Sequence, residues 1–559
     1  MKIDDTRENP PHEPWADALA DAIHAGDPPE EATATKAEEL AALKEVIRFM
    51  KKKPRGFELN QALDLFGRSR CFQDQRQEHY IEIIEKDRRQ TLRLDSKAFQ
   101  QIFAERYHQH TREALNETTR RQMMRILHGQ ARLGPRLRLS VRMAEEKEGL
   151  LLDMGTECGH LAVIHTGGWE ILRRGRPQFL QPPHMLTLPK PVGGQREIRY
   201  QAKGEAKSEA KTGPEGEGQT PAREPAKEAP IHMELLRELM PQLHEMDWQG
   251  VLAWLTGTLH PGLILPMLCL IGPQGSGKTT MARILRRILD PSTAETMALP
   301  TENGMLSLLQ DHAIPIFDNA GRLNTAQANM LCRAVTGNAK SLTDGNETAQ
   351  ERLRRPLILT ALELPSLAPD WLDRAWIIDL AQMENGRRIP ESGLWPLFDT
   401  LHAQLLAAAL DLTSATLAAW HRLTPSDLPR MADFATWGMA SMAAQGQPAE
   451  QFLACIERNG ARLREAELEA NPMASAILEM LERAEATNDE NGKTVRRWEG
   501  GMEDLLEQVP AEARPYRTAA GRKLRTMAPL LGHFGLRLEF QRNKKEGKRT
   551  IKIEHRMTE

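Results

Sequence analysis

The chain has 559 residues, with 74 lysines and arginines against 77 aspartates and glutamates and a formal net charge of −3. This length is enough for about three or four domains, each with its own core, which excludes a fibrous or wholly disordered protein. A net charge so close to zero argues at first against a strongly basic nucleic-acid-binding protein.

The cysteines and the apolar runs indicate a cytoplasmic protein. None of the five cysteines has a second cysteine or a histidine at a zinc-ligand spacing, so we expect a reducing compartment and no structural zinc. No charged and apolar leader opens the sequence, and its longest apolar run, residues 263–271, is interrupted by Pro266 and too short to cross a bilayer. We therefore expect neither secretion nor a membrane partner.

The charges are unevenly distributed along the chain. Residues 1–40 contain three basic and eleven acidic residues, whereas residues 517–559 contain twelve basic and four acidic residues. Between Glu117 and Glu145 seven arginines follow one another without an acid: Arg120, Arg121, Arg125, Arg132, Arg136, Arg138 and Arg142. Such a surface attracts a polyanion, although for any single arginine an ordinary solvated helix face is the simpler explanation.

In chain order, the first part predicts an arm, a domain and a linker. Residues 1–36 predict a disordered acidic arm. Residues 37–200 predict an N-terminal α+β accessory domain, with helices over 37–50, 98–107 and 117–133 and strands over 137–143, 150–154 and 161–164. Residues 201–230 contain no large apolar side chain, so they predict a flexible linker.

The second part predicts three further domains, which makes the fold class multidomain α/β. Strand-like and helical runs alternate over residues 231–383, which is typical of a layer of helices on a mainly parallel sheet. Residues 384–470 predict a helical domain. Residues 471–559 predict three helices followed by strands over 536–541 and 550–555, an order that suits a winged helix.

Residues 272–279 read GPQGSGKT, a complete phosphate-binding loop motif between an apolar strand and a helix. Its glycines let backbone amides face the phosphates, Lys278 would reach the β- and γ-phosphates, and the Thr279 hydroxyl would bind Mg²⁺. A glycine-rich turn that matches by chance is the alternative. The predicted nucleotide-binding residues are Gly272, Pro273, Gln274, Gly275, Ser276, Gly277, Lys278, Thr279 and Thr280.

An acid on a neighbouring strand is the second requirement of such a site. Asp318 ends the apolar run 313–318 and would hold the hydrated Mg²⁺ together with Thr279. Asn319 follows where hydrolysing relatives often have a second acid. Because an amide is a poor base, either hydrolysis is slow or another acid, Asp311 or Glu302, contributes.

Two further residues are candidates for contacts with the γ-phosphate. Thr360 ends the apolar run 356–360 and would touch the γ-phosphate or the attacking water, unless it only caps the strand. An arginine such as Arg374, at the edge of a nucleotide domain, can project into the site of the next subunit as an arginine finger, but these residues taken alone favour a pair within the chain with Asp370, Asp373 or Asp379.

The order of these elements resembles the AAA+ core of superfamily 3 helicases. It is more specifically similar to the primase-helicase-type ATP-binding proteins of bacterial prophages and integrative elements, through Asp318-Asn319, the segment CRAVTG at 332–337 and the segment DWLDR at 370–374. The resemblance implies ATP as the nucleotide, a homo-oligomeric ring expected to be a hexamer, and Arg374 as the finger. It also implies that Lys340 lies on a pore-facing hairpin that grips single-stranded DNA.

This chain departs from the family at two points. These helicases usually have Asn where Thr360 stands, which puts its sensor role in doubt. A primase site needs two or more acids on adjacent strand positions, and residues 150–153 offer Asp153 alone. We therefore expect the helicase half without the synthetic half.

The C-terminal basic residues predict a DNA contact by a helix and a wing. Those on or near the predicted helix are Arg522, Lys523 and Arg525, and those on the turn are Lys544, Lys545, Lys548 and Arg549. The alternative is a winged helix used only for packing.

Together these observations predict an ATP-dependent DNA helicase or translocase that acts on single-stranded or forked DNA during replication of a mobile element, with a primase or other replication protein as a further partner. One alternative is a nucleotide-gated DNA-binding or loading factor with slow hydrolysis. Another is the ATPase of an anti-phage defence module.

Overall fold

A computed structural model describes residues 65–66, 69–75, 77–85, 88–112, 114–147, 149–173, 179–192, 233–337, 340–344, 347–351, 354–383, 389–488, 494–511, 514–542 and 549–556. The predicted acidic arm, the helix over 37–50, the linker over 201–230 and the lysines Lys544, Lys545 and Lys548 lie outside these residues. Only the backbone of Lys340 and Arg549 is described.

The chain divides into two compact units, residues 1–67 with 100–127 and residues 68–99 with 128–559. Most of α4 (Lys97–Thr111) and α5 (Glu117–Leu133) belongs to the first unit, and both helices confirm the predictions at 98–107 and 117–133. Within this unit Phe66 packs edge-on against Phe103, with ring centroids 5.6 Å apart. The arginines Arg121 and Arg125 lie on the exposed side of α5.

Two antiparallel sheets precede the phosphate loop in the second unit. The first contains β1 (Arg70–Gln73), β2 (His79–Glu85) and β3 (Arg88–Arg93), and the second contains β4 (Met143–Glu146), β5 (Gly149–Asp153), β6 (His160–His165) and β7 (Gly168–Arg173). The predicted strands at 150–154 and 161–164 correspond to β5 and β6.

The predicted strand over residues 137–143 is wrong, because β4 begins only at Met143. Apolar and basic residues alternate over this segment, which is a strand pattern. Arg142, however, has a φ of 62° in the left-handed region, and its side chain is fully buried rather than directed to solvent. The strands β1 to β3 were not predicted.

A parallel four-stranded sheet positions the nucleotide site. Its order is β13 (Ala375–Asp379), β8 (Met267–Ile271), β12 (Ile358–Ala361) and β9 (Ile316–Phe317). The central strands β8 and β12 are almost wholly apolar, as expected for strands that are covered on both faces. The mixed α/β fold with a parallel sheet is therefore confirmed.

Among the described residues, two helices lie directly before these strands in the chain, and four helices and a hairpin connect them. The helices are α6 (Glu234–Glu238), α7 (Glu245–Thr258), α8 (Lys278–Leu289), α9 (Glu302–Asp311), α10 (Thr325–Thr336) and α11 (Pro369–Leu372). The hairpin joins β10 (Lys340–Asp344) to β11 (Glu347–Glu351), and it lies outside the parallel sheet. Lys340 is the first residue of β10.

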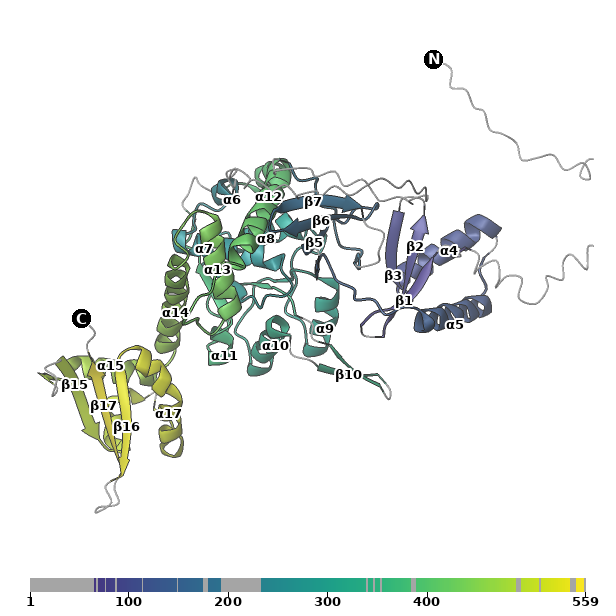
Figure 1. Cartoon of the computed structure of the whole chain (residues 1–559). Helices are drawn as coiled ribbons and strands as arrows, with labels where there is room; N and C mark the ends of the chain where they lie inside the picture. The colour runs from purple at the N-terminus through teal and green to yellow at the C-terminus, as the bar shows by residue number, and fades with distance from the viewer. Residues whose placement is uncertain are drawn as a thin grey trace, which may run out of the picture. The chain divides into compact units, whose positions relative to one another are not determined.

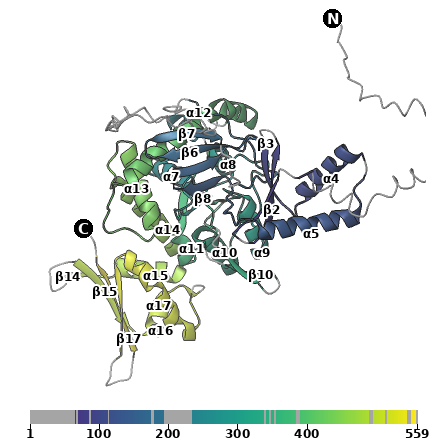
Figure 2. The same cartoon turned by 45° about the vertical axis from the view of Figure 1, so that its right-hand side comes forward.

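Three helices follow the parallel sheet, as predicted for residues 384–470: α12 (Glu391–Trp420), α13 (Ala432–Ala444) and α14 (Gln451–Glu469). The strands β6 and β7 lie beside α12 (Figures 1 and 2). The indole Nε1 of Trp169 donates to Asp411 at 2.8 Å, and Met143 shares one buried cluster with Leu285 of α8 and Leu410 of α12. The sequence did not predict that the second N-terminal sheet shares a core with the phosphate-loop region.

The C-terminal segment contains α15 (Pro472–Arg483), β14 (Ala486–Asn488), β15 (Thr494–Gly500), α16 (Met502–Gln508), α17 (Arg517–His533), β16 (Leu536–Arg542) and β17 (Arg549–Arg556). The three helices and the last two strands were predicted, whereas β14 and β15 were not. The four strands form an antiparallel sheet in the order β14, β15, β17, β16 over a core of their own. Among the described helices, none has the length and apolarity needed to cross a bilayer.

Candidate nucleotide site

The phosphate loop leaves β8 and ends at the first residue of α8. Gly272 has a φ of 139°, and a Cβ atom on it would lie 2.2 Å from the carbonyl oxygen of Leu380, so only glycine fits there. Gly277 is the N-cap of α8 with a φ of 82°. The backbone between them is therefore free to turn around an anion at the helix N-terminus, where amide groups and the helix dipole favour negative charge.

Lys278 lies over this loop. Its Nζ donates to the carbonyl oxygens of Gly272 and Pro273, both at 2.7 Å, and to Ser276 Oγ at 3.3 Å. Burial lowers the pKa of Lys278 from its ordinary value, and the nearby charge of Asp318 opposes this shift. The ammonium group is thus held where the motif requires it, by weak carbonyl partners that phosphate oxygens could replace.

Three oxygen-bearing side chains meet at the end of the sheet. Asp318 Oδ1 accepts a hydrogen bond from Thr279 Oγ1 at 2.8 Å and another from Thr360 Oγ1 at 2.5 Å. The sequence analysis predicted that the strand before Asp318, β9, would be adjacent to β8. This prediction was wrong, because β12 lies between the two strands. Thr360 belongs to this intervening strand, and Asp318 is the acceptor that both threonines share.

Thr360 is hydrogen-bonded on both sides within the chain. Its side chain is buried, and its hydroxyl donates to Asp318 while accepting from the backbone N–H of Asn319 at 2.9 Å. A contact of Thr360 with the γ-phosphate or the attacking water stays a prediction. Asn319 itself is exposed, with a φ of 53°.

The donors present suit Mg²⁺ and a polyphosphate. Magnesium prefers hard oxygen ligands and retains several waters, so the hydroxyl of Thr279 and the carboxylate of Asp318 fit it. Neither of the two acids proposed as substitutes for a second carboxylate is shown to contact this pair. Glu302 binds Arg333 at 2.7 Å, and Asp311 lies next to His184.

Two residues beside the loop were missed by the sequence analysis. A Cβ atom on Gly277 would lie 3.3 Å from the sulfur of Met383 and 3.5 Å from Nε2 of Gln242. The Oε1 atom of Gln242 is buried and has no hydrogen-bond partner among the described residues. Neither residue belongs to a motif, so no local signal in the sequence could have identified them.

Arg374 lies in a cluster of two arginines and two aspartates. Its Nη1 donates to the backbone carbonyl of Asp370 at 2.6 Å and also binds the Asp370 carboxylate. Arg430 binds the carboxylates of both Asp370 and Asp373. The hydrogen bond from Arg374, helped by the charges of both arginines, lowers the pKa of Asp370.

Within the single chain, Arg374 therefore forms the intrachain pair that was weighed as the alternative to a finger. The same cluster borders a cavity of about 220 Å³, lined also by Thr336 and Asp433. Arg430 was missed because it lies far from Arg374 in the sequence, with no motif around it.

The predicted DNA-contacting side chains of the C-terminal segment are partly visible. Arg522, Lys523 and Arg525 are exposed on α17, whose opposite side buries Leu524, Met527 and Leu531. The guanidinium of Arg525 lies 4.9 Å from the ring centroid of Phe540 on β16. These cations are therefore displayed on the helix as predicted, next to a half-exposed aromatic ring.

Comparison with known proteins supports the resemblance for the middle of the chain. Residues 242–458, which contain all the site residues described above except those of the C-terminal segment, match a family described as actinomycete integrative conjugative element replication protein. No curated protein matches the sequence.

Several solved structures share a distant likeness. The active helicase Cch of SCCmec type IV has 9% identity and a TM-score of 0.43, with 86% of this chain and 92% of the other covered. The C-terminal region of NrS-1 has 12% identity and a TM-score of 0.36, with 89% and 98% covered. The JCV helicase has 12% identity and a TM-score of 0.20, with 39% and 75% covered. The family match is the stronger finding, and over residues 242–458 this chain is similar to the replication proteins of actinomycete integrative conjugative elements.

Proposed function

We propose that this protein is an ATP-dependent DNA helicase or translocase that works as an oligomeric ring in the replication of a mobile element. One observation supports it most: a complete phosphate loop whose Thr279 is hydrogen-bonded, at 2.8 Å, to the acid Asp318 at the end of another strand of the same sheet. A chance glycine-rich turn would not place a metal-binding pair beside Lys278.

Each residue of this group has a role in the proposed reaction. Backbone N–H groups of residues 274–279 bind the phosphates, and Lys278 contacts their β- and γ-oxygens. Thr279 and Asp318 hold Mg²⁺, which when bound neutralises charge on the phosphates. Thr360 fixes the orientation of Asp318, and Asn319 orients the attacking water without removing its proton efficiently.

Arg374 is the residue proposed to act on the neighbouring subunit. To reach that site it must leave the carboxylate of Asp370, to which it is bound in the single chain. Arg430 already contacts Asp370 and Asp373, so these acids keep a cation when Arg374 moves. Because Arg430 remains beside these acids, the electrostatic cost of separating Arg374 from Asp370 is lower.

The DNA contacts are assigned to two regions. Lys340 at the start of the β10–β11 hairpin is proposed to face the pore. In the C-terminal segment, the order α15, β15, α16, α17, β16, β17 suits a winged helix, with α17 directed to a groove. Lys544, Lys545 and Lys548, which lie between β16 and β17 in the sequence, and Arg549, the first residue of β17, are proposed to contact the nucleic-acid backbone.

A strand-displacement assay on forked DNA tests this function. We expect ATP-dependent release of the displaced strand by the wild-type chain and none by a Lys278→Ala variant, with both proteins forming rings of the same size. Failure of the wild-type ring to displace any strand, at a measurable rate of ATP hydrolysis, would contradict the helicase proposal.

The second candidate function is a nucleotide-gated loading factor. The amide at Asn319, where a base would be needed for rapid hydrolysis, favours it. A loader binds forked DNA only with ATP and releases it after slow hydrolysis, so ATP-dependent fork binding without displacement would identify it.

A further inference from the structure

We propose that Arg142, which lies before β4 in the N-terminal part of the chain, is a positioning residue for the Thr279–Asp318 pair. The nucleotide site would then depend on a segment more than a hundred residues before the phosphate loop, outside the region that matches the replication-protein family. This inference rests on the proposed function, in which Thr279 and Asp318 hold Mg²⁺.

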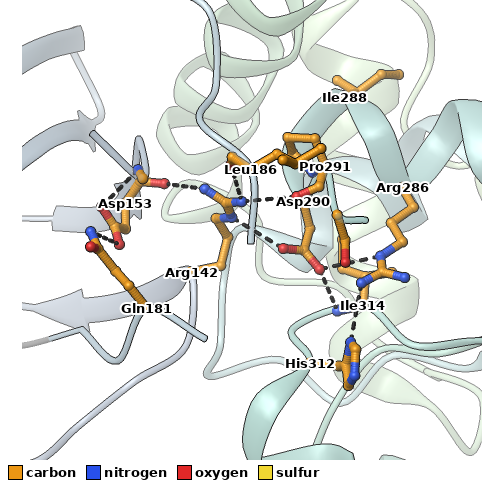
Figure 3. Close-up of polar contacts among 12 residues, drawn as sticks. Arg142, Asp153, Gln181, Leu186, Arg286, Ile288, Asp290, Pro291, His312 and Ile314 are labelled. Atoms are coloured by element: carbon orange, nitrogen blue, oxygen red, sulfur yellow. Dashed lines mark hydrogen bonds and ion pairs between the residues drawn. The ribbon is translucent and has the colours of Figure 1, made fainter. Parts of the chain in front are cut away.

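Arg142 is fully buried, and all three nitrogens of its guanidinium group donate hydrogen bonds (Figure 3). Its Nε donates to Asp290 Oδ1 at 3.1 Å, and its Nη1 donates to the carbonyl oxygen of Asp153 at 3.0 Å. Its Nη2 donates to the carbonyl oxygens of Leu186 at 2.7 Å and Pro291 at 3.2 Å. A buried cation is tolerated only with such partners, and only the planar fork of arginine reaches them all.

Asp290 connects this arginine to the phosphate-loop helix. It is the C-cap of α8, the helix whose first turn contains Lys278 and Thr279. Its second oxygen, Oδ2, accepts from Arg286 Nε at 3.4 Å and from the backbone N–H of Ile314 at 3.3 Å. Ile314 lies just before β9, so one buried carboxylate joins Arg142, the end of α8 and the strand that leads to Asp318.

The backbone makes a second connection along the same route. Residues 184–186 form two hydrogen bonds of 2.9 Å with residues 291–293, the segment that follows α8. Four residues later, Met297 donates to the carbonyl of Ile316 at 2.9 Å and accepts from the N–H of Asp318 at 3.0 Å. The segment 291–297 is therefore hydrogen-bonded to the N-terminal part of the chain at residues 291–293 and to the backbone of Ile316 and Asp318 at Met297.

The consequence concerns the spacing of the metal-binding pair. Thr279 is fixed at one end of α8 and Asp318 at the end of β9, and Asp290 sets how the helix and the strand lie together. Without the guanidinium of Arg142, Asp290 loses a charged partner and three carbonyl groups lose their donor. Partners hydrogen-bonded directly to metal ligands typically alter metal affinity by about 10- to 100-fold when changed. Arg142 acts from further away, through Asp290, so we expect an effect at the lower end of this range.

The test compares Arg142→Gln with the wild type in the full chain, by two measurements. The first is hydrogen exchange without nucleotide, in which we expect faster exchange at the amides of Ile314 and Asp318. The second is the thermal shift produced by ADP alone and by ADP with Mg²⁺. We expect the shift with ADP alone to remain, because the phosphate loop is intact, and the additional shift due to Mg²⁺ to require about 10-fold more Mg²⁺.

Arg138→Gln is the matched control, since it removes an exposed arginine from the same segment and should change neither measurement. Wild-type exchange and an unchanged Mg²⁺ requirement in Arg142→Gln would overturn the inference. Equal loss of the ADP and Mg²⁺ shifts would also overturn it, because the effect would then be general.

If Arg142→Gln does not fold, Asp290→Asn provides the same test with a similar shape and no charge. A wild-type chain without any ADP shift would overturn the proposed function and this inference with it.

Discussion

The two ends of α8 differ in their physical character, although they belong to one helix of 12 residues. At the first end, a glycine-rich loop with exposed residues at 273–275 surrounds Lys278, which donates hydrogen bonds to atoms within residues 272–276. At the other end, Arg286 and Asp290 are buried, and their partners come from residues as distant as Arg142 and His312.

This difference indicates that the loop end of α8 has the chemical role and the buried end has the structural one. The loop contains groups that a nucleotide would contact, and their removal leaves few buried groups without partners. The buried cluster contacts no nucleotide, but it holds three charged side chains in a low-dielectric interior, where the loss of one partner is costly. Substitutions at the first end should therefore change activity more than stability, and substitutions at the second should change stability first.

The largest expected effect is at the buried end. In Arg286→Met the carbonyl oxygens of Ala294 and Glu295 lose donors at 2.6 and 2.9 Å, and Asp290 loses a charged partner. We expect a loss of about 3–5 kcal/mol in the free energy of unfolding. Denaturant unfolding followed by tryptophan fluorescence measures it, since Trp254 and Trp437 are fully buried in the same core.

Arg287→Met is the matched control, one residue further along α8. Arg287 binds Glu295 at 2.9 Å and is a quarter exposed, so its loss should cost about 1 kcal/mol or less. Equal destabilisation by the two variants would contradict the contrast between a buried pair and a partly exposed one.

The next effect is at the phosphate loop. Lys278→Ala should reduce the rate of ATP hydrolysis by about 10²–10³-fold, because a preorganised cation at the developing charge is removed. The thermal midpoint should change little, since Lys278 donates only to nearby loop atoms. Lys147→Ala, at an exposed position away from the loop, should retain the wild-type rate, and comparable hydrolysis by Lys278→Ala would disprove the assignment of the site.

The sequence predicts the loop end of α8 well and the buried end poorly. The glycines, Lys278, Thr279 and Asp318 were identified because the loop motif and the strand ends are local patterns, and parallel strands bring their ends together. The insertion of β12 between β8 and β9 is a matter of topology, which no local pattern specifies. The Arg142–Asp290 pair could not be predicted, because a buried arginine looks the same in sequence as the exposed arginines around it.

A smaller effect is expected at Thr360, which contacts Asp318 near the phosphate-loop end of α8. Thr360→Val keeps the shape but removes the hydroxyl that binds Asp318 and the amide of Asn319, so Asp318 loses one of its two hydroxyl donors. We expect about a 10-fold lower rate of ATP hydrolysis, typical of a lost hydrogen bond to a charged group. Thr360→Ser restores the hydroxyl and should recover most of the rate; a poor rate in both variants would show that packing of the methyl group matters instead.

The smallest effect is a dependence of stability on pH at the buried end. His312 accepts from Arg286 at 3.2 Å and stacks on His184, with ring centroids 4.0 Å apart. Burial, with the positive charges of His184 and Arg286, lowers the pKa of His312 to about 3, against a weaker opposing effect of Asp290. In the folded chain His312 is therefore neutral at pH 5, where an unfolded histidine is protonated.

Because the unfolded state binds the extra proton, this contribution to stability is complete above about pH 6.5 and decreases as the pH falls toward 3. His312→Gln keeps an acceptor for Arg286 and cannot be protonated, so its thermal midpoint should fall less than that of the wild type between pH 7 and pH 5. His184, whose pKa is also lowered by burial, should preserve part of the slope. His533→Gln, at an exposed position on α17, should keep the wild-type slope. If His312→Gln kept it too, the buried cluster would not be the source of acid sensitivity, and the contrast between the two ends of α8 would rest on the arginines alone.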